Sequence, residues 1–363
     1  MLKTAPAVFA VDTSYQILVP LTRDALVWVR VGENEYYDES NGIMRSLSEL
    51  HRVTVPMAAL DAARSYTLCV RPLIERKPYY TETEPVVEYT YAFRPVPASG
   101  VRAYHISDAH NSIERPIAAA KVFTDANGPL DLLILNGDVI DHSGDPSKFA
   151  NIYEICSRLT SGEIPVVFSR GNHDMRGNYA ERFAEYTPSH LGRTYYTFRL
   201  GAIWGILLDC AEDKVDGYES YGHTICCHAF RRRQTTFLRD VIAHADREYA
   251  APGVTTRLVI SHIPFAQRFA SPFDIEEKVY REWCALFRDH VKPDLMICGH
   301  VHRLEVRPIG HPADNYGQPC PVITGGKPGK EAYTGCGIVI GDDRFTVTFT
   351  DSSGAYDPHI IDR

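Results

Sequence analysis

The sequence predicts an α/β protein with a mixed sheet, preceded by a small all-β sandwich. Two observations lead to this expectation. Residues 7–97 consist of short segments rich in β-branched and aromatic residues, separated by turn residues and almost without helical periodicity. From residue 98 to the C-terminus, apolar strands alternate with longer helical stretches, which is the pattern of α/β layering.

The N-terminal strands are expected to be antiparallel. In residues 25–31, Leu26, Trp28 and Arg30 alternate with three valines, so the two sets point to opposite faces of a strand. The strands predicted in this segment are Ala25–Val31, Arg52–Pro56, Tyr66–Arg71 and Val86–Phe93. Short strands at this spacing favour a sandwich of two antiparallel sheets.

The segment from Leu60 to Val70, LDAARSYTLCV, resembles the corner before strand F of a fibronectin type III domain. The resemblance implies that the hydroxyl of Tyr66 bonds back to the backbone upstream. Residues 94–100 are rich in Pro and Gly, and neither periodicity continues across them. We therefore predict a linker there, with a fibronectin III-like sandwich at residues 1–97 and a second domain at residues 98–363.

The second segment carries the alternating pattern of strands and helices. Its first predicted strands are Val101–Ile106, Leu132–Leu135, Val166–Phe168, Ile203–Leu208, Leu258–Ile260 and Leu295–Cys298. The predicted helices lie near Ser112–Asp125, Pro146–Ser161, Phe230–Arg247 and Ile275–Asp289. Further strands are expected at Val322–Thr324, Gly337–Ile340 and Phe345–Thr350. Because these last strands follow one another without helices, a mixed sheet is favoured over a purely parallel one.

Charge and composition argue against several classes of protein. The 363 residues include 38 Lys and Arg against 46 Asp and Glu, a net charge of −8 that is spread along the chain. A nucleic-acid partner is not expected, because such binding needs a basic surface. No stretch has the roughly 20 apolar residues of a membrane span, and residues 1–20 lack the features of a secretory signal, so we expect a cytoplasmic protein without membrane contact. The nine scattered cysteines are expected to be reduced.

Polar clusters follow the predicted strands of the second segment, and their residue types are those of metal ligands. They are Ser107-Asp108-Ala109-His110, Asn136-Gly137-Asp138, Gly171-Asn172-His173-Asp174, Ser261-His262 and Gly299-His300-Val301-His302. In open α/β sheets, ligands bind outside the carboxyl ends of the strands, so these loops can converge on one crevice. Glycines in the clusters permit the tight turns that bring side chains off a strand end.

The candidate ligands are carboxylate, imidazole and amide groups, without thiolate. This set favours Mn, Fe, Zn or Ni and argues against iron–sulfur clusters and structural zinc. Two ions that lie close together need an anion between them, because their positive charges repel each other. Asp138 is the candidate bridge between two such ions.

In this order the five clusters resemble the calcineurin-like metallophosphoesterase superfamily, whose pattern is D-x-H, G-D, G-N-H-D/E, H and G-H-x-H. The resemblance implies a sandwich of the α/β/β/α type and a dinuclear metal centre. The ligands that it implies for one ion are Asp108, His110, Asp138 and His302. For the other ion it implies Asp138, Asn172, His262 and His300.

The resemblance also assigns roles to three further residues. His173 would lie beside the leaving group, where it donates a proton or stabilises phosphoryl charge, and Asp174 would orient its imidazole. Asp141 would lie next to the ligands without binding a metal ion itself. The implied reaction is hydrolysis of a phosphoester, in which a metal-bound hydroxide attacks phosphorus in line.

The purple acid phosphatase branch of this superfamily also places a small β domain before the catalytic fold. Its pattern has a Tyr where Asp141 stands and lacks the His at position 110, so this sequence departs from it at both points. We therefore expect a colourless or weakly coloured protein, without charge transfer from a tyrosinate to iron.

Several alternatives stay open at the level of the sequence. The ligands do not separate phosphodiester from phosphomonoester substrates, although the acidic surface favours a small substrate. The rival function is a non-catalytic metal-binding scaffold that retains the fold, with the N-terminal sandwich as the contact surface for a protein partner. Residues 211–228 form either a substrate lid or a plain surface excursion. Histidines outside the clusters are expected to be structural.

Overall fold

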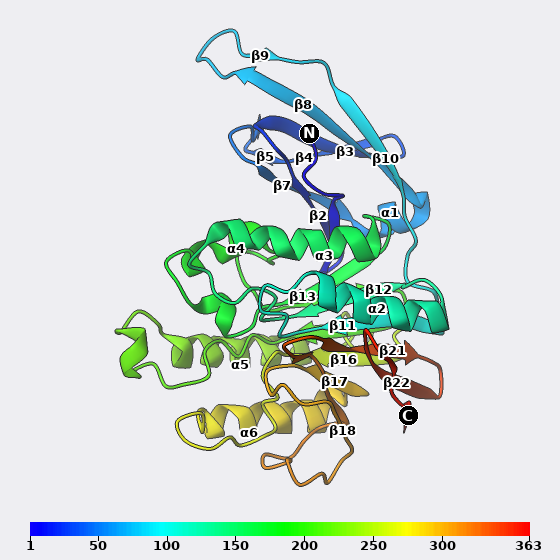
Figure 1. The fold of residues 1–363 in the computed structure, drawn as a ribbon, viewed down its shortest axis with the longest axis vertical. Coiled ribbons are helices and arrows are strands. Elements are labelled where there is room, and N and C mark those ends of the chain that lie inside the picture. The colour runs from blue at the N-terminus through cyan, green and yellow to red at the C-terminus, as the bar shows by residue number, and fades with distance from the viewer.

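The computed structural model describes residues 1–363 and contains two large sheets, with helices on their outer faces (Figure 1). An 11-stranded sheet has the order β23-β22-β21-β11-β12-β13-β1-β2-β7, with β20 beside β21 and β24 beside β22. A 6-stranded sheet has the order β14-β15-β16-β17-β19-β18. Both sheets contain parallel and antiparallel neighbours, so the prediction of an α/β fold with mixed sheets is confirmed.

The bounds of the elements are as follows. The strands of the first sheet are β1 (Ala7–Val11), β2 (Ser14–Pro20), β7 (Leu50–Pro56), β11 (Val101–Ile106), β12 (Leu132–Asn136), β13 (Pro165–Ser169), β20 (Lys327–Pro328), β21 (Tyr333–Ile340), β22 (Arg344–Asp351), β23 (Gly354–Ala355) and β24 (His359–Asp362). Those of the second are β14 (Tyr196–Leu200), β15 (Ile203–Leu207), β16 (Thr256–Ile260), β17 (Leu295–Cys298), β18 (Glu305–Arg307) and β19 (Val322–Thr324). A third sheet contains β3 (Ala25–Val31), β4 (Asn34–Tyr37), β8 (Ser65–Glu75), β9 (Glu82–Thr83) and β10 (Val87–Ala92), and a small hairpin contains β5 (Glu39–Ser40) and β6 (Ile43–Met44). The helices are α1 (Met57–Ala63), α2 (Glu114–Asn127), α3 (Ala150–Thr160), α4 (Phe183–Tyr186), α5 (Cys227–Ala243) and α6 (Glu277–Leu286).

Alternate side chains of the strands lie in separate layers of the core. On β12, Ile134 lies in the core between the two sheets, whereas its neighbours Leu133 and Leu135 pack under α2 and α3. On β16, Leu258 lies between the sheets and Val259 packs under α5 and α6. The period of two that a strand imposes on its side chains therefore builds a helix–sheet–sheet–helix stack.

The N-terminal region consists mainly of strands, and these divide between two sheets. β1 runs parallel to β13, with Val8 opposite Pro165 and Phe9 opposite Val166. β2 and β7 continue the 11-stranded sheet, while β3, β4, β8 and β10 form the third sheet, whose buried side chains belong to the same core. The β-rich region expected before the α/β layers is present, but it shares a sheet with them. The division into domains at residue 97 stays a prediction.

The predicted fibronectin-type corner is not confirmed. Residues 57–63 form helix α1, which ends at Arg64 in the left-handed conformation, with φ 54°. Tyr66 follows in β8, and its hydroxyl donates to the carbonyl oxygen of Gly162, beyond α3, at 2.8 Å. The expectation that this hydroxyl bonds to the backbone upstream is therefore wrong. Tyr66 instead ties the third sheet to the α/β layers.

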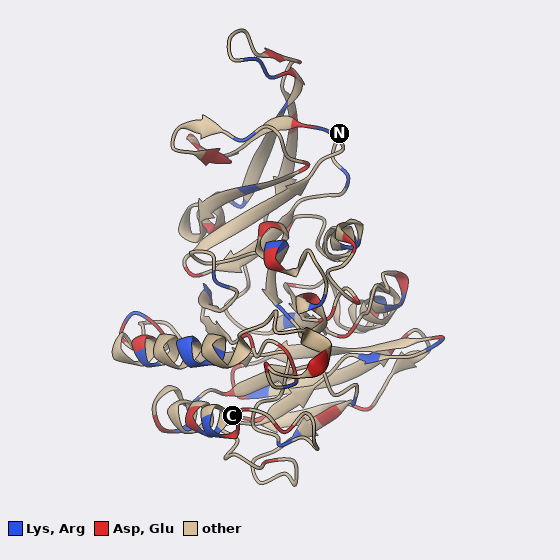
Figure 2. Ribbon diagram, turned by 90° about the vertical axis from the view of Figure 1, so that its left-hand side faces the viewer, with Lys and Arg blue, Asp and Glu red and all other residues tan.

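The surface carries charges of both signs. Figure 2 shows Lys and Arg interspersed with Asp and Glu over the elements, which agrees with the spread of charge in the sequence. None of the helices has the length and low polarity that crossing a membrane requires. The nine cysteines are free thiols, and all except Cys226 are buried.

Phe9→Ala should destabilise the protein by about 3–5 kcal/mol, which is the usual cost of truncating a buried Phe. Phe9 is fully buried, and its ring packs edge-on against Phe168 of β13 with 6.2 Å between centroids. The measurement is the free energy of unfolding in urea. Ile74→Ala is the matched control, because the Ile74 side chain in β8 is 58% exposed and its loss should change stability by less than about 0.5 kcal/mol. Equal effects of the two substitutions would contradict the packing of β1 into this core.

Candidate metal centre

The predicted metal ligands lie in loops that follow central strands of the two large sheets. Asp108, Asp138 and Asn172 follow the neighbouring parallel strands β11, β12 and β13. His262 follows β16, and His300 follows its parallel neighbour β17. The loops of the two sheets meet, because the backbone N–H of His300 donates to the carboxylate of Asp108 at 3.0 Å. The carboxyl ends of the strands therefore converge on one place, as the sequence predicted.

Five of the predicted ligands have a left-handed backbone conformation. The φ angle is 55° at Asp108, 43° at His110, 53° at Asp138, 66° at His300 and 51° at His302. This region costs a non-glycine residue about 1 kcal/mol or more, and Asp and His tolerate it better than most residues. Strained backbone that is gathered in one place is typical of functional sites, where the surrounding structure holds it.

Two glycines stand where any side chain would collide with a ligand. A Cβ atom at Gly171 would lie 2.2 Å from Oδ1 of Asp138, and one at Gly299 would lie 2.7 Å from Oδ2 of Asp108. Neither glycine has a positive φ, so close approach and not backbone conformation requires them. The glycines of the G-N-H-D and G-H-x-H motifs thus make room for the carboxylates of neighbouring loops.

A buried cluster of Asp108, Asp138 and His262 forms the centre of the site. The Nε2 atom of His262 lies 3.2 Å from Oδ2 of Asp138 and 3.7 Å from Oδ1 of Asp108. The Ser107 hydroxyl donates to Oδ2 of Asp108 at 2.7 Å, and the backbone N–H of His173 donates to Oδ1 of Asp138 at 2.8 Å. Both carboxylates are thus held by protein donors, and Oδ1 of Asp108, which also accepts the His300 N–H at 3.2 Å, and Oδ2 of Asp138 face His262.

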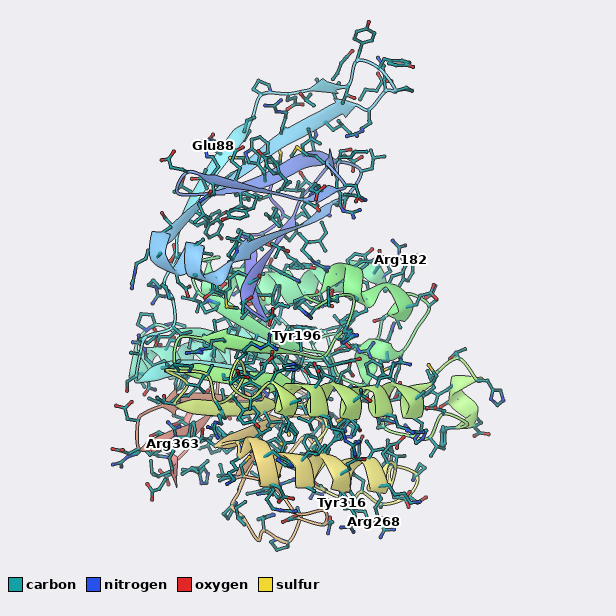
Figure 3. The ribbon with its side chains drawn as sticks, turned by 180° about the vertical axis from the view of Figure 1, so that it is seen from behind. Glu88, Arg182, Tyr196, Arg268, Tyr316 and Arg363 are labelled. Carbon is teal, nitrogen blue, oxygen red and sulfur yellow. The ribbon has the colours of Figure 1, made fainter.

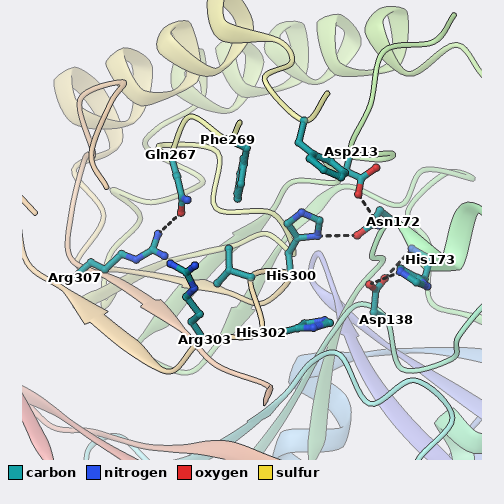
Figure 4. Close-up of a pocket in the computed structure, with 12 residues that line it drawn as sticks. Asp138, Asn172, His173, Asp213, Gln267, Phe269, His300, His302, Arg303 and Arg307 are labelled. Atoms are coloured by element: carbon teal, nitrogen blue, oxygen red, sulfur yellow. Dashed lines mark hydrogen bonds and ion pairs between the residues drawn. The ribbon is translucent and has the colours of Figure 1, made fainter. Parts of the chain in front are cut away.

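The other predicted ligands surround this cluster. The Nε2 atom of His302 lies 3.1 Å from Oδ1 of Asp108 and 3.3 Å from Nε2 of His110. The Nδ1 atom of His300 lies 3.0 Å from Oδ1 of Asn172 (Figure 4). Three groups have ligand atoms close enough to share an ion: Asp108 with His110 and His302, Asp108 with Asp138 and His262, and Asp138 with His110 and His173. The fold thus brings the seven predicted ligands together.

Burial and charge act against each other at these groups. Burial alone would raise the pKa of Asp138, but the histidines around it, His262 first, lower that pKa well below its usual range. Burial would likewise lower the pKa of His262, but Asp138 and Asp108 raise it to about 10. At His300 burial prevails and lowers the pKa to about 4. The two carboxylates therefore favour a positive charge between themselves and His262.

The donor set fits a metal ion. The Nδ1–H of His262 donates to the carbonyl oxygen of Asn136 at 2.7 Å, which is how proteins commonly fix the tautomer of a metal-binding histidine. Its Nε2 atom is buried, has no hydrogen-bond partner and faces two carboxylates. The raised pKa of His262 means that a proton on Nε2 can offset the two carboxylates, and a metal ion would take the place of that proton and bind the neutral imidazole. Carboxylate, amide and imidazole ligands without thiolate suit Mn, Fe, Zn or Ni.

Residues 101–304 match the family model described as calcineurin-like phosphoesterase, which covers more than half of the chain. The chain belongs to this family. Purple acid phosphatase PPD1 from yellow lupin (Lupinus luteus) seeds has a fold similar to that of this chain. The TM-score is 0.64 and the identity 14%, over 100% of this chain and 75% of that chain. The protein TT1561 of Thermus thermophilus is similar over 73% of this chain and 99% of that chain, with a TM-score of 0.39 and 10% identity. No curated protein matches the chain.

In this chain His173 lies beside the ligands, but Asp174 does not orient it. The Nδ1–H of His173 donates to the carbonyl oxygen of Asp141 at 2.8 Å, and Nε2 lies 4.0 Å from Oδ2 of Asp138. The Asp174 carboxylate instead accepts from the backbone N–H groups of Gly171 at 2.7 Å and Asp138 at 3.2 Å. The orienting role expected for Asp174 is therefore wrong. Asp174 holds two ligand loops together, and burial raises its pKa to about 8.

Arg176 and Glu212 form an ion pair at the site that was not expected from the sequence. Arg176 donates to Nε2 of His173 at 2.9 Å and binds the carboxylate of Glu212 with two hydrogen bonds of 2.9 and 3.1 Å. Next to it, Asp213 accepts from the side-chain amide of Asn172 at 3.5 Å and pairs with Lys214 at 2.7 Å. The amide of Asn172 is thereby turned so that its oxygen faces His300.

The sequence predicted residues 211–228 as either a lid or a surface excursion. The first residues of this segment are hydrogen-bonded to residues of the site. Besides Glu212 and Asp213, the hydroxyl of Tyr221 donates to Oε2 of Glu212 at 2.8 Å. The sequence contains a signal for Glu212 and Asp213, because both follow strand β15 just as the predicted ligands follow their strands. The predicted metal-ligand motifs did not include this position.

A cavity of about 380 Å³ opens beside the ligands (Figure 4). Its lining includes four of the predicted ligands, Asp138, Asn172, His300 and His302. The rest of the lining consists of His173, Asp213, Gln267, Phe269, Phe273, Val301, Arg303 and Arg307. This volume lies in the range of sites for small molecules.

Arg176→Met should destabilise the protein by about 3 kcal/mol, because it leaves the Glu212 side chain, which is 1% exposed, without its cation. Adding Glu212→Gln should recover part of this loss, so the two substitutions should be coupled by about 1 kcal/mol or more. The measurement is a double-mutant cycle of unfolding free energies. Arg182→Met is the control, because its pair with Glu185 is exposed on both sides and should contribute less than about 1 kcal/mol. If the effects of the two substitutions on the unfolding free energy simply add, Arg176 and Glu212 are not coupled.

Proposed function

We propose that this protein hydrolyses a small phosphoester through a dinuclear metal centre. The main support is the buried convergence of Asp108, Asp138 and His262, in which Nε2 of His262 faces both carboxylates without a hydrogen-bond partner. Burying two carboxylates side by side costs free energy that a cation would offset. The strained backbone of five predicted ligands is a second cost that packing alone does not explain.

In the proposed centre the two ions share Asp138. The ligands of one ion would be Asp108, His110, Asp138 and His302. Those of the other would be Asp138, Asn172, His262 and His300. The Oδ1 atom of Asp138 already accepts the N–H of His173, and Asp138 would hold both ions through its carboxylate. When bound, the ions would activate water and neutralise negative charge on the phosphoryl oxygens.

The proposed role of His173 is to protonate the leaving group. Its Nδ1 is fixed by the carbonyl oxygen of Asp141, which leaves Nε2 as the nitrogen directed at the substrate. In this structure Nε2 accepts from Arg176, so proton donation requires that this contact open and that Nε2 take up a proton. Arg176 would then place a fixed positive charge near the phosphoryl group. Asp141 occupies the position of the tyrosine of purple acid phosphatases, so the prediction of a colourless or weakly coloured protein is retained.

The purified protein should hydrolyse bis-p-nitrophenyl phosphate, p-nitrophenyl phosphate or both when Mn²⁺ is added, and EDTA should abolish the activity. The measurement is release of p-nitrophenolate, and the two substrates separate diester from monoester activity. Absence of both activities with Mn²⁺, Zn²⁺, Fe²⁺ and Ni²⁺ would favour the non-catalytic scaffold instead.

Asp138→Asn should lower the content of both metals, because it weakens the shared ligand, whereas His173→Ala should retain metal and lower kcat at least about 100-fold. Metal per chain is measured by mass spectrometry with inductively coupled plasma, beside kcat for the better substrate. His244→Ala, at the exposed end of α5, is the control for loss of an imidazole away from the site. Equal loss of metal in the Asp138 and His173 variants would show that the proton donor is misassigned.

A further inference from the structure

The cavity beside the ligands has two ends of different chemistry. Figure 4 shows Asp138, Asn172 and His300 toward one end, and the guanidinium groups of Arg303 and Arg307 at the other. The proposed ions would make the first end a site for a phosphoryl group. At the second end, the guanidinium of Arg303 would have no anionic partner in this phosphoryl group. The cavity is therefore built for more than one anionic group.

The two guanidinium groups differ in how they are satisfied. Arg307 is 3% exposed, and it donates to Oε2 of Glu305 and to Oε1 of Gln267, each at 2.7 Å. Arg303 is exposed, and its side chain takes part in no ion pair or hydrogen bond within the protein. Arg307 is thus held in place by its neighbours, whereas Arg303 presents an unpaired cation to the cavity.

Aromatic side chains line the wall of the same cavity. The ring of Phe269 stands edge-on to the His300 ring, with 5.6 Å between centroids. Phe273 is 36% exposed, and Nζ of Lys214 lies 4.7 Å from its ring centroid. Figure 4 shows Phe269 between Gln267 and His300, on the way from the guanidinium end to the ligands. A planar group of a substrate could pack on this wall.

We infer that the preferred substrate is a phosphoester whose organic part carries a planar ring and a second anionic group, and that Arg303 binds this second group. The inference rests on the proposed function, because it places the scissile phosphoryl group at the ligands. Arg303 follows His302 directly in the chain, so the residue that selects the substrate is fixed to a predicted ligand. A guanidinium binds carboxylate and phosphate alike with charge-assisted hydrogen bonds.

The test compares two phosphonates that are not hydrolysed: 4-carboxybenzylphosphonate and its neutral analogue 4-carbamoylbenzylphosphonate. Binding to the full-length protein in Mn²⁺ buffer is measured by isothermal titration calorimetry. The carboxylate compound should bind about tenfold more tightly, and Arg303→Ala should bring the ratio of the two dissociation constants close to one. Arg268→Ala removes an exposed arginine that does not line the cavity and should leave the ratio as it is (Figure 3).

Equal binding of the two phosphonates, binding of neither, or an unchanged ratio in Arg303→Ala would overturn the inference. Turnover is then measured with the corresponding aryl phosphates, 4-carboxyphenyl and 4-carbamoylphenyl phosphate. Selective binding of the carboxylate phosphonate without turnover of either aryl phosphate would count against the proposed hydrolysis while the subsite stands. Turnover of both aryl phosphates without selective binding would leave the proposed hydrolysis intact and remove the subsite.

Discussion

The site depends on two carboxylates, those of Asp108 and Asp138, buried beside His262 where the loops of the two sheets meet. Charges of one sign at this depth are stable only if the protein surrounds them with donors and a cation. The backbone supplies part of this, since the N–H groups of His173 and His300 donate to the two carboxylates. The remaining attraction falls on the imidazoles, which are positioned to share one or more positive charges. The loops accept left-handed conformations to achieve this arrangement.

The strands and the ligands could be predicted from the sequence because they obey local rules. A buried central strand is a short apolar run, and here each run ends in a polar cluster, so that both the sheet and its functional edge are visible in one pattern. The strand at Val101–Ile106 has the predicted bounds for this reason. The positions of Gly171 and Gly299 also carry local information, because their missing side chains make room for Asp138 and Asp108.

Contacts between loops could not be predicted in the same way. Asp174 follows His173 in the chain, yet its carboxylate turns to the backbone of Gly171, and the carbonyl group of Asp141 orients the imidazole. The pair of Arg176 with Glu212 joins segments far apart in the sequence, and a charged residue in a loop has too many partners within reach for sequence alone to choose one. The Tyr66 hydroxyl likewise reaches Gly162, which no local motif indicates.

The shared sheet gives the N-terminal region a physical connection to the site. Without β1, strand β13 would be an edge strand, and β13 leads directly into the loop that carries Asn172 and His173. The parallel pairing of β1 with β13 supplies the missing partner, and the packing of Phe9 on Phe168 adds a side-chain contact. Just beyond β1, the backbone N–H of Asp12 donates to the carbonyl oxygen of Thr197 in the other large sheet at 2.7 Å. The first strand of the chain thus joins both sheets close to a ligand loop, so a change in its packing would act on the position of Asn172.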